Sequence, residues 1–116
     1  MKIVNIKDVE KKKVLMEGAF NAFKQIPISK ADGTPNFSMR VFTIEPNGYT
    51  PYHNHNYEQL NYIIDGEGIL INEKGEEISL KTGDFVLIMP DEMHQYKNKL
   101  SDKNFVFICC VPKEYE

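Results

Sequence analysis

Short apolar stretches alternate with turn residues along most of the chain. Each stretch is rich in aromatic and β-branched residues, and turn signals recur about every eight to twelve residues. The stretches are Phe37–Ile44, Leu60–Ile64, Ile69–Ile71, Ile78–Leu80, Phe85–Met89 and Phe105–Val111. No long apolar pattern follows the helical period. The pattern therefore predicts an all-β sandwich or barrel in which each stretch is a strand.

The turn residues suggest how some strands connect. Asp65-Gly66 and Lys74-Gly75 tolerate positive φ, and we expect a hairpin across each pair. Pro27 and Pro51 interrupt strand-like stretches, which predicts edge positions or bulges there. The region from Val9 to Ala22 is compatible with a short helix or with an irregular entry segment.

The histidines are few, and their spacing suggests a metal site. His53 and His55 are two residues apart and would share one face of a strand, and His94 follows after another strand and a turn. Gln59 has the parity of the histidine pair, so it can face the same interior. Three imidazoles and an amide oxygen suit one divalent transition metal, namely iron, manganese, nickel, zinc or copper, better than calcium or magnesium.

The segment around the histidine pair resembles the first motif of the cupins, small β-barrels whose two motifs jointly bind one metal. That motif reads G-x5-H-x-H-x3/4-E-x6-G. Asn47 stands in the place of its first glycine, and asparagine is a mild substitute in a left-handed turn. His53 and His55 match the histidines, Gln59 occupies the glutamate position, and Gly66 closes the motif. The resemblance implies His53, His55, Gln59 and His94 as metal ligands.

Glu58 is a rival to Gln59 for the fourth ligand position. It is a carboxylate one residue away. Strand parity turns Glu58 outward, which favours Gln59 as the ligand.

The second cupin motif reads G-x5-P-x-G-x2-H-x3-N. Gly83 opens it here, His94 is its histidine and Asn98 ends it at the matching interval. Met89 replaces the proline and Asp91 replaces the second glycine, so the departures affect the turn and not the ligand.

The resemblance also implies the domain organisation. We expect one domain over residues 1–116, folded as the cupin double-stranded β-helix, or jelly-roll barrel. Residues 1–19 would form an entry segment, residues 47–66 the first metal motif and residues 83–98 the second.

Composition narrows the function classes. The 116 residues carry a formal net charge of −3, so we expect no nucleic-acid or anionic-membrane partner. The longest apolar run, Phe105–Val111, is far short of the ~20 residues of a membrane helix, and the first residues lack a secretory signal. We therefore expect a cytoplasmic protein. Cys109 and Cys110 are adjacent, and we interpret them as reduced packing residues.

Two further residues are candidates for substrate contact. Arg40 is the only arginine, and a lone guanidinium among apolar neighbours suits a bidentate carboxylate; the alternative is a surface residue paired with an acid on a neighbouring strand. Tyr96 shares parity with His94 and would supply a hydroxyl to substrate, or else plug the barrel. The other tyrosines near the first motif are predicted to serve packing, namely Tyr52, Tyr57 and Tyr62.

These observations give two functional hypotheses. The first is a metal-dependent enzyme that acts on a small anionic ligand, such as a sugar acid or a 2-oxo or 2-hydroxy acid, by isomerisation, ring opening or oxygen-dependent cleavage. The alternative is a metal-containing binding or sensing module without turnover. A purely structural metal is a third interpretation.

Assembly is suggested by an apolar segment before the first motif. Phe20, Phe23, Ile26 and Ile28 are more apolar than a solvated edge strand usually is. Cupins that resemble this chain pair through such strands, so we expect a homodimer.

Overall fold

The computed structural model describes residues 1–116. It contains nine strands and three 3₁₀ helices. The strands are β1 (Lys12–Lys13), β2 (Phe20–Ile28), β3 (Phe37–Tyr49), β4 (Gln59–Asp65), β5 (Glu67–Ile71), β6 (Glu77–Lys81), β7 (Phe85–Ile88), β8 (Gln95–Lys97) and β9 (Phe105–Pro112). The helices are η1 (Ile6–Asp8), η2 (Lys30–Asp32) and η3 (Lys113–Tyr115). None of them is long or apolar enough to cross a membrane.

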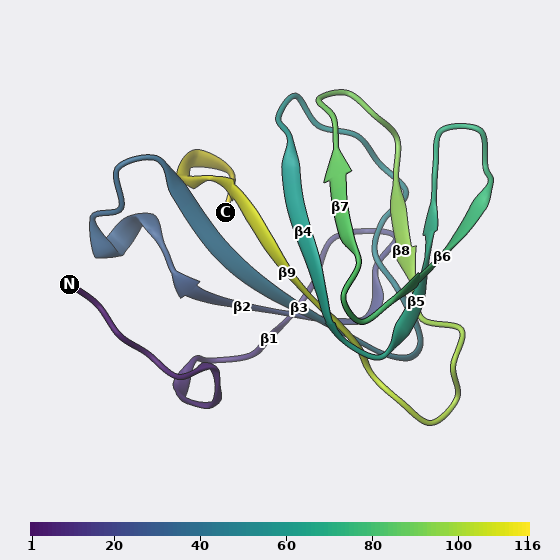
Figure 1. The fold of residues 1–116 in the computed structure, drawn as a ribbon, viewed down its shortest axis with the longest axis horizontal. Coiled ribbons are helices and arrows are strands. Elements are labelled where there is room, and N and C mark those ends of the chain that lie inside the picture. The colour runs from purple at the N-terminus through teal and green to yellow at the C-terminus, as the bar shows by residue number, and fades with distance from the viewer.

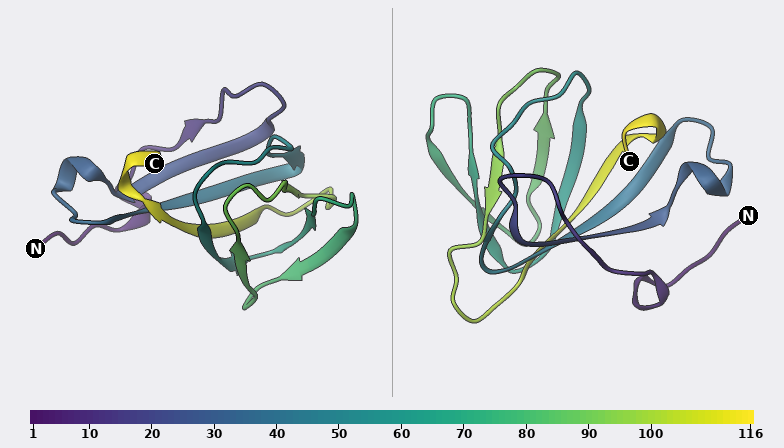
Figure 2. Two further views of the ribbon diagram at one scale, coloured as in Figure 1. Left: turned by 90° about the horizontal axis from the view of Figure 1, so that it is seen from above. Right: turned by 180° about the vertical axis from the view of Figure 1, so that it is seen from behind.

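The strands form one curled antiparallel sheet. Its order is β6-β5-β8-β3-β9-β4-β7, and β2 lies beside β3 with β1 outside it. Figures 1 and 2 show the sheet rolled into a half-barrel around a common interior. This arrangement confirms the predicted all-β, barrel-like fold.

Each of the six predicted stretches lies within or almost within a strand. Phe85–Met89 overruns β7 by one residue, and β3 continues past the predicted Phe37–Ile44 as far as Tyr49. Strand β8 was not predicted, because its three residues are too few and too polar to give an alternating pattern. Between Val9 and Ala22 the chain forms only β1 and turns before β2 begins, so the irregular alternative holds there.

One of the two predicted hairpins is wrong. The turn at Lys74-Gly75 does join the paired strands β5 and β6. Across Asp65-Gly66, however, β4 pairs with β7 and β9, whereas β5 pairs with β6 and β8. Gly66 has φ +78°, and an added Cβ there would lie 2.2 Å from the carbonyl oxygen of Asn104. The glycine therefore makes a tight corner where the chain changes from one wall of the barrel to the other.

Of the two proline predictions, one is confirmed. Pro27 lies in β2 where its register with β3 shifts between Gln25 and Ile28, so the predicted bulge is confirmed. Pro51 lies after the end of β3, outside any strand, because the chain has already left the sheet for the first histidine segment.

The interior face of the sheet changes from polar to apolar along the strands. One cross-strand row consists of Arg40, Cys109 and Asn61, on β3, β9 and β4. The next row in the same direction on the same face consists of Phe42, Phe107 and Ile63. The apolar end is closed by fully buried residues such as Phe105 and Ile44. The interior face of the sheet thus has an apolar end and a polar end.

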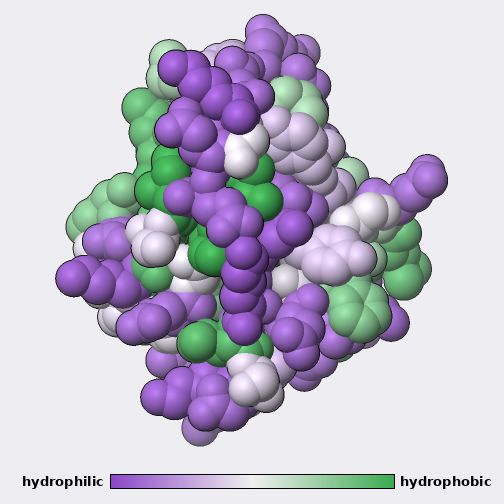
Figure 3. Space-filling view, turned by 90° about the vertical axis from the view of Figure 1, so that its right-hand side faces the viewer, coloured by the Kyte–Doolittle hydropathy of each residue, from purple (hydrophilic) through white to green (hydrophobic).

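The outer surface is uneven in polarity. The side that carries β5 and β6 is mainly hydrophilic (Figure 3). On the outer face of β3, β4 and β9, a cavity of about 450 Å³ separates the residues Lys2–Ile6 from the sheet, and its lining is apolar. None of the three histidines lines this cavity.

We predict that Gly68→Ala destabilises the fold. Gly68 is buried on β5, and an added Cβ would lie 2.3 Å from the Phe105 ring, which is fully buried and has no room to move. Overpacking of this kind lowers the free energy of unfolding by about 1–3 kcal/mol, to be measured by urea denaturation. Ser79→Ala on the exposed partner strand is the control and should change it by less than about 0.5 kcal/mol. Equal midpoints for the two variants would contradict the packing described here.

Candidate metal centre

The two histidine segments are joined by a pair of backbone hydrogen bonds. The His53 amide donates to the His94 carbonyl at 3.2 Å, and the His94 amide donates to the His53 carbonyl at 2.9 Å. The pair is an isolated antiparallel bridge outside the named strands. Residues about forty positions apart in the chain are thereby placed side by side.

Two left-handed turns lead into these segments. Asn47 has φ 64° and Asp91 has φ 66°. Both stand where the cupin motifs have glycine, and both adopt the conformation that glycine usually supplies. The Asp91 amide also donates to the His55 carbonyl at 2.7 Å, which fixes the His55 backbone. The departures from the motifs therefore leave the turn geometry intact.

The three imidazoles converge. Their candidate ligand atoms lie within 4.8 Å of one another. Ring centroids are 5.5 Å apart for His53 and His55, 5.1 Å for His53 and His94, and 4.9 Å for His55 and His94. The pair His53 and His55 does not share a strand face as predicted, because only His53 takes part in a bridge. Their convergence depends on that bridge and on the Asp91 turn.

Hydrogen bonds fix which ring nitrogens are free. His55 Nδ1 is 2.8 Å from the Tyr57 carbonyl oxygen, and His94 Nδ1 is 2.8 Å from the Glu92 carbonyl oxygen. A carbonyl oxygen only accepts, so each Nδ1 carries the proton and each Nε2 keeps its lone pair. His55 Nε2 is buried and has no hydrogen-bond partner. A lone pair held in this way is the usual state of a metal-binding histidine, so the residues fit a divalent transition metal.

Burial keeps the imidazoles neutral. Desolvation lowers the pKa of His94 to about 4, and it also lowers the pKa of His53 and of His55. The nearby Arg40 guanidinium lowers the pKa of His53 and His55 further. Neutral rings are the form in which histidine donates to a metal.

Gln59 and Glu58 differ in environment. Gln59 is buried at the first position of β4, on the interior face that also carries Asn61. Glu58 precedes the strand and is exposed. Among histidines, cysteines and carboxylates, the converging group contains His53, His55 and His94 and does not include Glu58.

A stack of three aromatic rings supports His55. The His55 imidazole lies 3.9 Å from the Tyr57 ring at an interplanar angle of 9°, and Tyr57 lies 4.1 Å from Tyr115 at 8°. Tyr57 was predicted to serve packing, and its ring does pack, directly on a histidine of the cluster.

Arg40 is inside the barrel and has no carboxylate partner. It is 6% exposed and takes part in none of the ion pairs of the structure, so the alternative of a surface arginine paired with an acid is wrong. Its Nη2 is 3.0 Å from Cys109 Sγ, and its Nη1 donates to the Tyr115 carbonyl at 3.5 Å. Its Nε is buried without a partner. A buried guanidinium needs hydrogen-bond acceptors, and the Nε of Arg40 can still donate to one.

Tyr96 lies on β8 and meets Asn61 across the interior. The Asn61 Nδ2 donates to the Tyr96 hydroxyl at 2.6 Å, while Asn61 Oδ1 is buried without a partner. Burial raises the pKa of Tyr96, so its hydroxyl stays protonated. Asn61 was not predicted as a site residue, although its parity with Gln59 on one strand was a usable signal.

The cysteines are free. Cys109 is buried and Cys110 is partly exposed, and burial raises the pKa of both thiols. Both therefore stay as thiols, in agreement with reduced packing residues. The contact of Cys109 with Arg40 had no signal in the sequence.

Comparison with protein families identifies the chain's relatives. Residues 40–111 match the family model described as "Cupin domain", and the match includes all three histidines. The chain belongs to the cupin family. Among solved structures, the polyketide cyclase RemF from Streptomyces resistomycificus is 27% identical, with a TM-score of 0.92 over 97% of this chain and 80% of that one. A predicted oxalate decarboxylase from Thermotoga maritima has a TM-score of 0.83 at 18% identity, over 96% of this cupin and 98% of that chain, which shows the shared fold.

Curated relatives match only in part. Gentisate 1,2-dioxygenase 1 from Aquipseudomonas alcaligenes is 32% identical over 65 residues, which are 56% of this chain and 18% of the dioxygenase. A gentisate 1,2-dioxygenase from a Streptomyces species is 25% identical over the same shares. This cupin therefore spans about a fifth of the length of the curated relatives it matches.

We predict that acid destabilises the metal-free protein through His94. The unfolded chain binds a proton at His94 near pH 6.5, whereas the folded chain does so only near pH 4. Stability is thus complete above pH 6.5 and is lost as the pH falls below it, by about 2 kcal/mol between pH 7 and pH 5. Urea denaturation at both pH values measures this loss. His94→Gln should show a much smaller loss, and an equal loss in both proteins would refute the assignment.

Proposed function

We propose that this cupin is a divalent-metal-dependent enzyme that acts on a small oxygenated acid, such as a sugar acid or a 2-oxo or 2-hydroxy acid. The reaction classes that fit are isomerisation, ring opening and oxygen-dependent cleavage. The observation that carries the proposal is the combination of three neutral, converging imidazoles with a buried arginine that has no carboxylate of its own.

In this proposal His53, His55, His94 and Gln59 hold the metal. All four are neutral, so the ion would keep its full positive charge and attract an anionic ligand. A bound divalent cation supplies polarisation of a ligand oxygen. The burial of Gln59 and the exposure of Glu58 support Gln59 as the fourth ligand.

Arg40 and Tyr96 are the proposed substrate contacts. The unpaired Nε of Arg40 is a donor for one carboxylate oxygen, and the guanidinium charge attracts the acid. Tyr96 keeps its proton and is anchored by Asn61, so it can donate a hydrogen bond to a ligand oxygen. Asn61 Oδ1 remains as an acceptor for a ligand hydroxyl.

The relatives support an enzyme of this general kind. They include proteins described as a polyketide cyclase, gentisate dioxygenases and a sugar phosphate isomerase from Silicibacter pomeroyi. All these names refer to compounds rich in oxygen. They differ in reaction, so they support the substrate chemistry more than any single reaction.

The sensing alternative is favoured by one observation. The metal assignment uses all three histidines, and no carboxylate joins them in the cluster, so a dedicated general base is missing there. Turnover assays on unsaturated uronates, and on diketones and catechols with oxygen, separate the two functions. Tight binding without turnover across that panel would favour the sensor.

We also propose that two copies pair along β2. Strand β2 lies beside β3, away from the main strand order, and only β1 pairs with its other side. Phe20 on β2 is 48% exposed. A solution mass of one chain at micromolar concentration would refute this pairing.

We predict that Gln59→Ala weakens metal binding about 10–100-fold, because one ligand is lost while the imidazoles remain. Glu58→Ala is the matched control and should leave the affinity unchanged. Titration of the metal-free protein with Zn²⁺, Ni²⁺, Mn²⁺ and Fe²⁺ measures both. The reverse order of effects would assign the fourth position to Glu58.

We predict that Arg40→Lys raises KM for the acid substrate, or Kd for a bound acid, about 10–100-fold. The loss corresponds to one charge-assisted hydrogen bond of about 1.5–3 kcal/mol. The amide analogue of the same acid should bind both proteins equally, because it carries no charge. If the acid also binds both proteins equally, Arg40 is not the carboxylate contact.

A further inference from the structure

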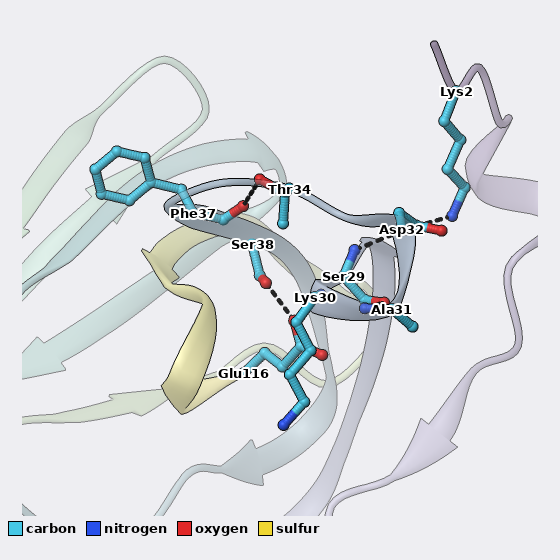
Figure 4. A network of polar contacts seen from close by, with 9 residues as sticks. All are labelled: Lys2, Ser29, Lys30, Ala31, Asp32, Thr34, Phe37, Ser38 and Glu116. Atoms are coloured by element: carbon cyan, nitrogen blue, oxygen red, sulfur yellow. Dashed lines mark hydrogen bonds and ion pairs between the residues drawn. The ribbon is translucent and has the colours of Figure 1, made fainter.

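The segment that follows β9 folds back over the interior side of β3. Its last residue, Glu116, places its side-chain carboxylate against Ser38 and the backbone of η2 (Figure 4). The Ser38 hydroxyl and the Lys30 amide both donate to Oε2 of Glu116, the latter at 2.9 Å. Ser38 is fully buried on the interior face of β3, two residues from Arg40.

The surroundings of this carboxylate are cationic. Lys24 Nζ donates to the backbone oxygen of Glu116 at 3.3 Å, and the Arg40 guanidinium donates to the Tyr115 carbonyl. Burial and the Arg40 charge lower the pKa of Lys24, while Glu116 opposes this effect. The Glu116 carboxylate thus accepts from a buried hydroxyl and an amide, while the two cations bind the backbone of the same segment.

The same segment contributes the outer ring of the stack beside His55. Tyr115, next to Glu116, is the outer ring of the stack on Tyr57 and His55. Its carbonyl also occupies one donor of Arg40. When the Glu116 carboxylate leaves Ser38 and the Lys30 amide, the Tyr115 ring can leave the stack and the Tyr115 carbonyl can leave Arg40.

We propose that the Ser38 hydroxyl and the Lys30 amide, with Lys24 nearby, form a carboxylate-binding site that Glu116 fills as an internal ligand. A small external carboxylate would displace the segment Lys113–Glu116, which removes the outer ring of the stack on His55 and frees one donor of Arg40. The carboxylate site stands on its own contacts. Only an effect of this displacement on a bound metal rests on the proposed function.

Exchange of the Glu116 carboxylate for an external carboxylate changes the free energy little. An incoming carboxylate remakes the bonds to Ser38 and the Lys30 amide, so the hydrogen bonds lost and gained are alike. A tethered side chain competes at an effective concentration in the millimolar range, so half-displacement also needs about millimolar external carboxylate. Segments of this length with few buried contacts open at low free-energy cost.

The chain contains no tryptophan, which allows a single reporter. In Tyr115→Trp the indole replaces the outer ring of the stack, and its fluorescence anisotropy reports release of the segment. The probe is benzoate, added to metal-free protein, with benzamide as the neutral analogue. We expect benzoate to lower the anisotropy in a saturable way at millimolar concentration and benzamide to leave it unchanged.

Two variants in this background separate the competing carboxylate from the site that binds it. Glu116→Gln removes the competing charge and should lower the half-saturating benzoate concentration about tenfold. Ser38→Ala removes a donor that both carboxylates use, so the two losses cancel and the half-saturating concentration should change by less than about twofold. Glu114→Gln is the matched control, since Glu114 is exposed in the same segment and should leave it unchanged.

A uniform loosening of the fold would lower the half-saturating concentration in the Ser38 variant as much as in the Glu116 variant, and that result would overturn the proposal. So would unchanged anisotropy at saturating benzoate, or equal effects of Glu116→Gln and Glu114→Gln. Because the titration is done without metal, it is independent of the proposed enzyme activity. Absent metal binding in the Gln59 experiment would refute the proposed function and leave the carboxylate site standing.

Discussion

The two hydrogen bonds between His53 and His94 are the constraint on which the site depends. They join the two motif segments across the top of the barrel and place one imidazole from each beside the other. The Asp91 turn then holds the backbone of His55 by a third bond, and the Tyr57 and Glu92 carbonyls orient two of the rings. The imidazoles converge because these hydrogen bonds hold the backbone that carries them. A metal at this place would find its imidazole ligands preorganised.

The division of the interior into a polar and an apolar part explains why such a site is stable. The stacked rings of Phe42 and Phe107 pack against the buried core. The neighbouring row holds Arg40, Cys109 and Asn61, of which Arg40 Nε and Asn61 Oδ1 are buried without a hydrogen-bond partner. Buried polar atoms without partners are rare in folded proteins and tend to occur where a ligand completes them. The Glu116 carboxylate binds Ser38, a little further along β3, and leaves Arg40 without a carboxylate partner.

Patterns in the sequence were enough for the fold class, six of the strands, the histidine cluster and the left-handed residue Asn47. Asn47 could be predicted because asparagine tolerates positive φ, whereas the positive φ of Asp91 was not predicted. The hairpin across Asp65-Gly66 was misassigned because a glycine corner between two parts of one sheet and a hairpin turn share the same residues, and only long-range pairing separates them. The stack of Tyr57 on Tyr115 was missed for a related reason: it joins a loop to the segment after β9, which no local period records. The environment of Arg40 likewise depends on register between β3 and β9.

X-ray absorption spectroscopy of the protein loaded with one equivalent of Zn²⁺ or Co²⁺ tests the metal site most directly. We expect a coordination shell of nitrogen and oxygen only, at about 2.0–2.1 Å for Zn²⁺, with the multiple-scattering signature of three imidazoles. A sulfur scatterer near 2.3 Å, or a signature of fewer than two imidazoles, would contradict it.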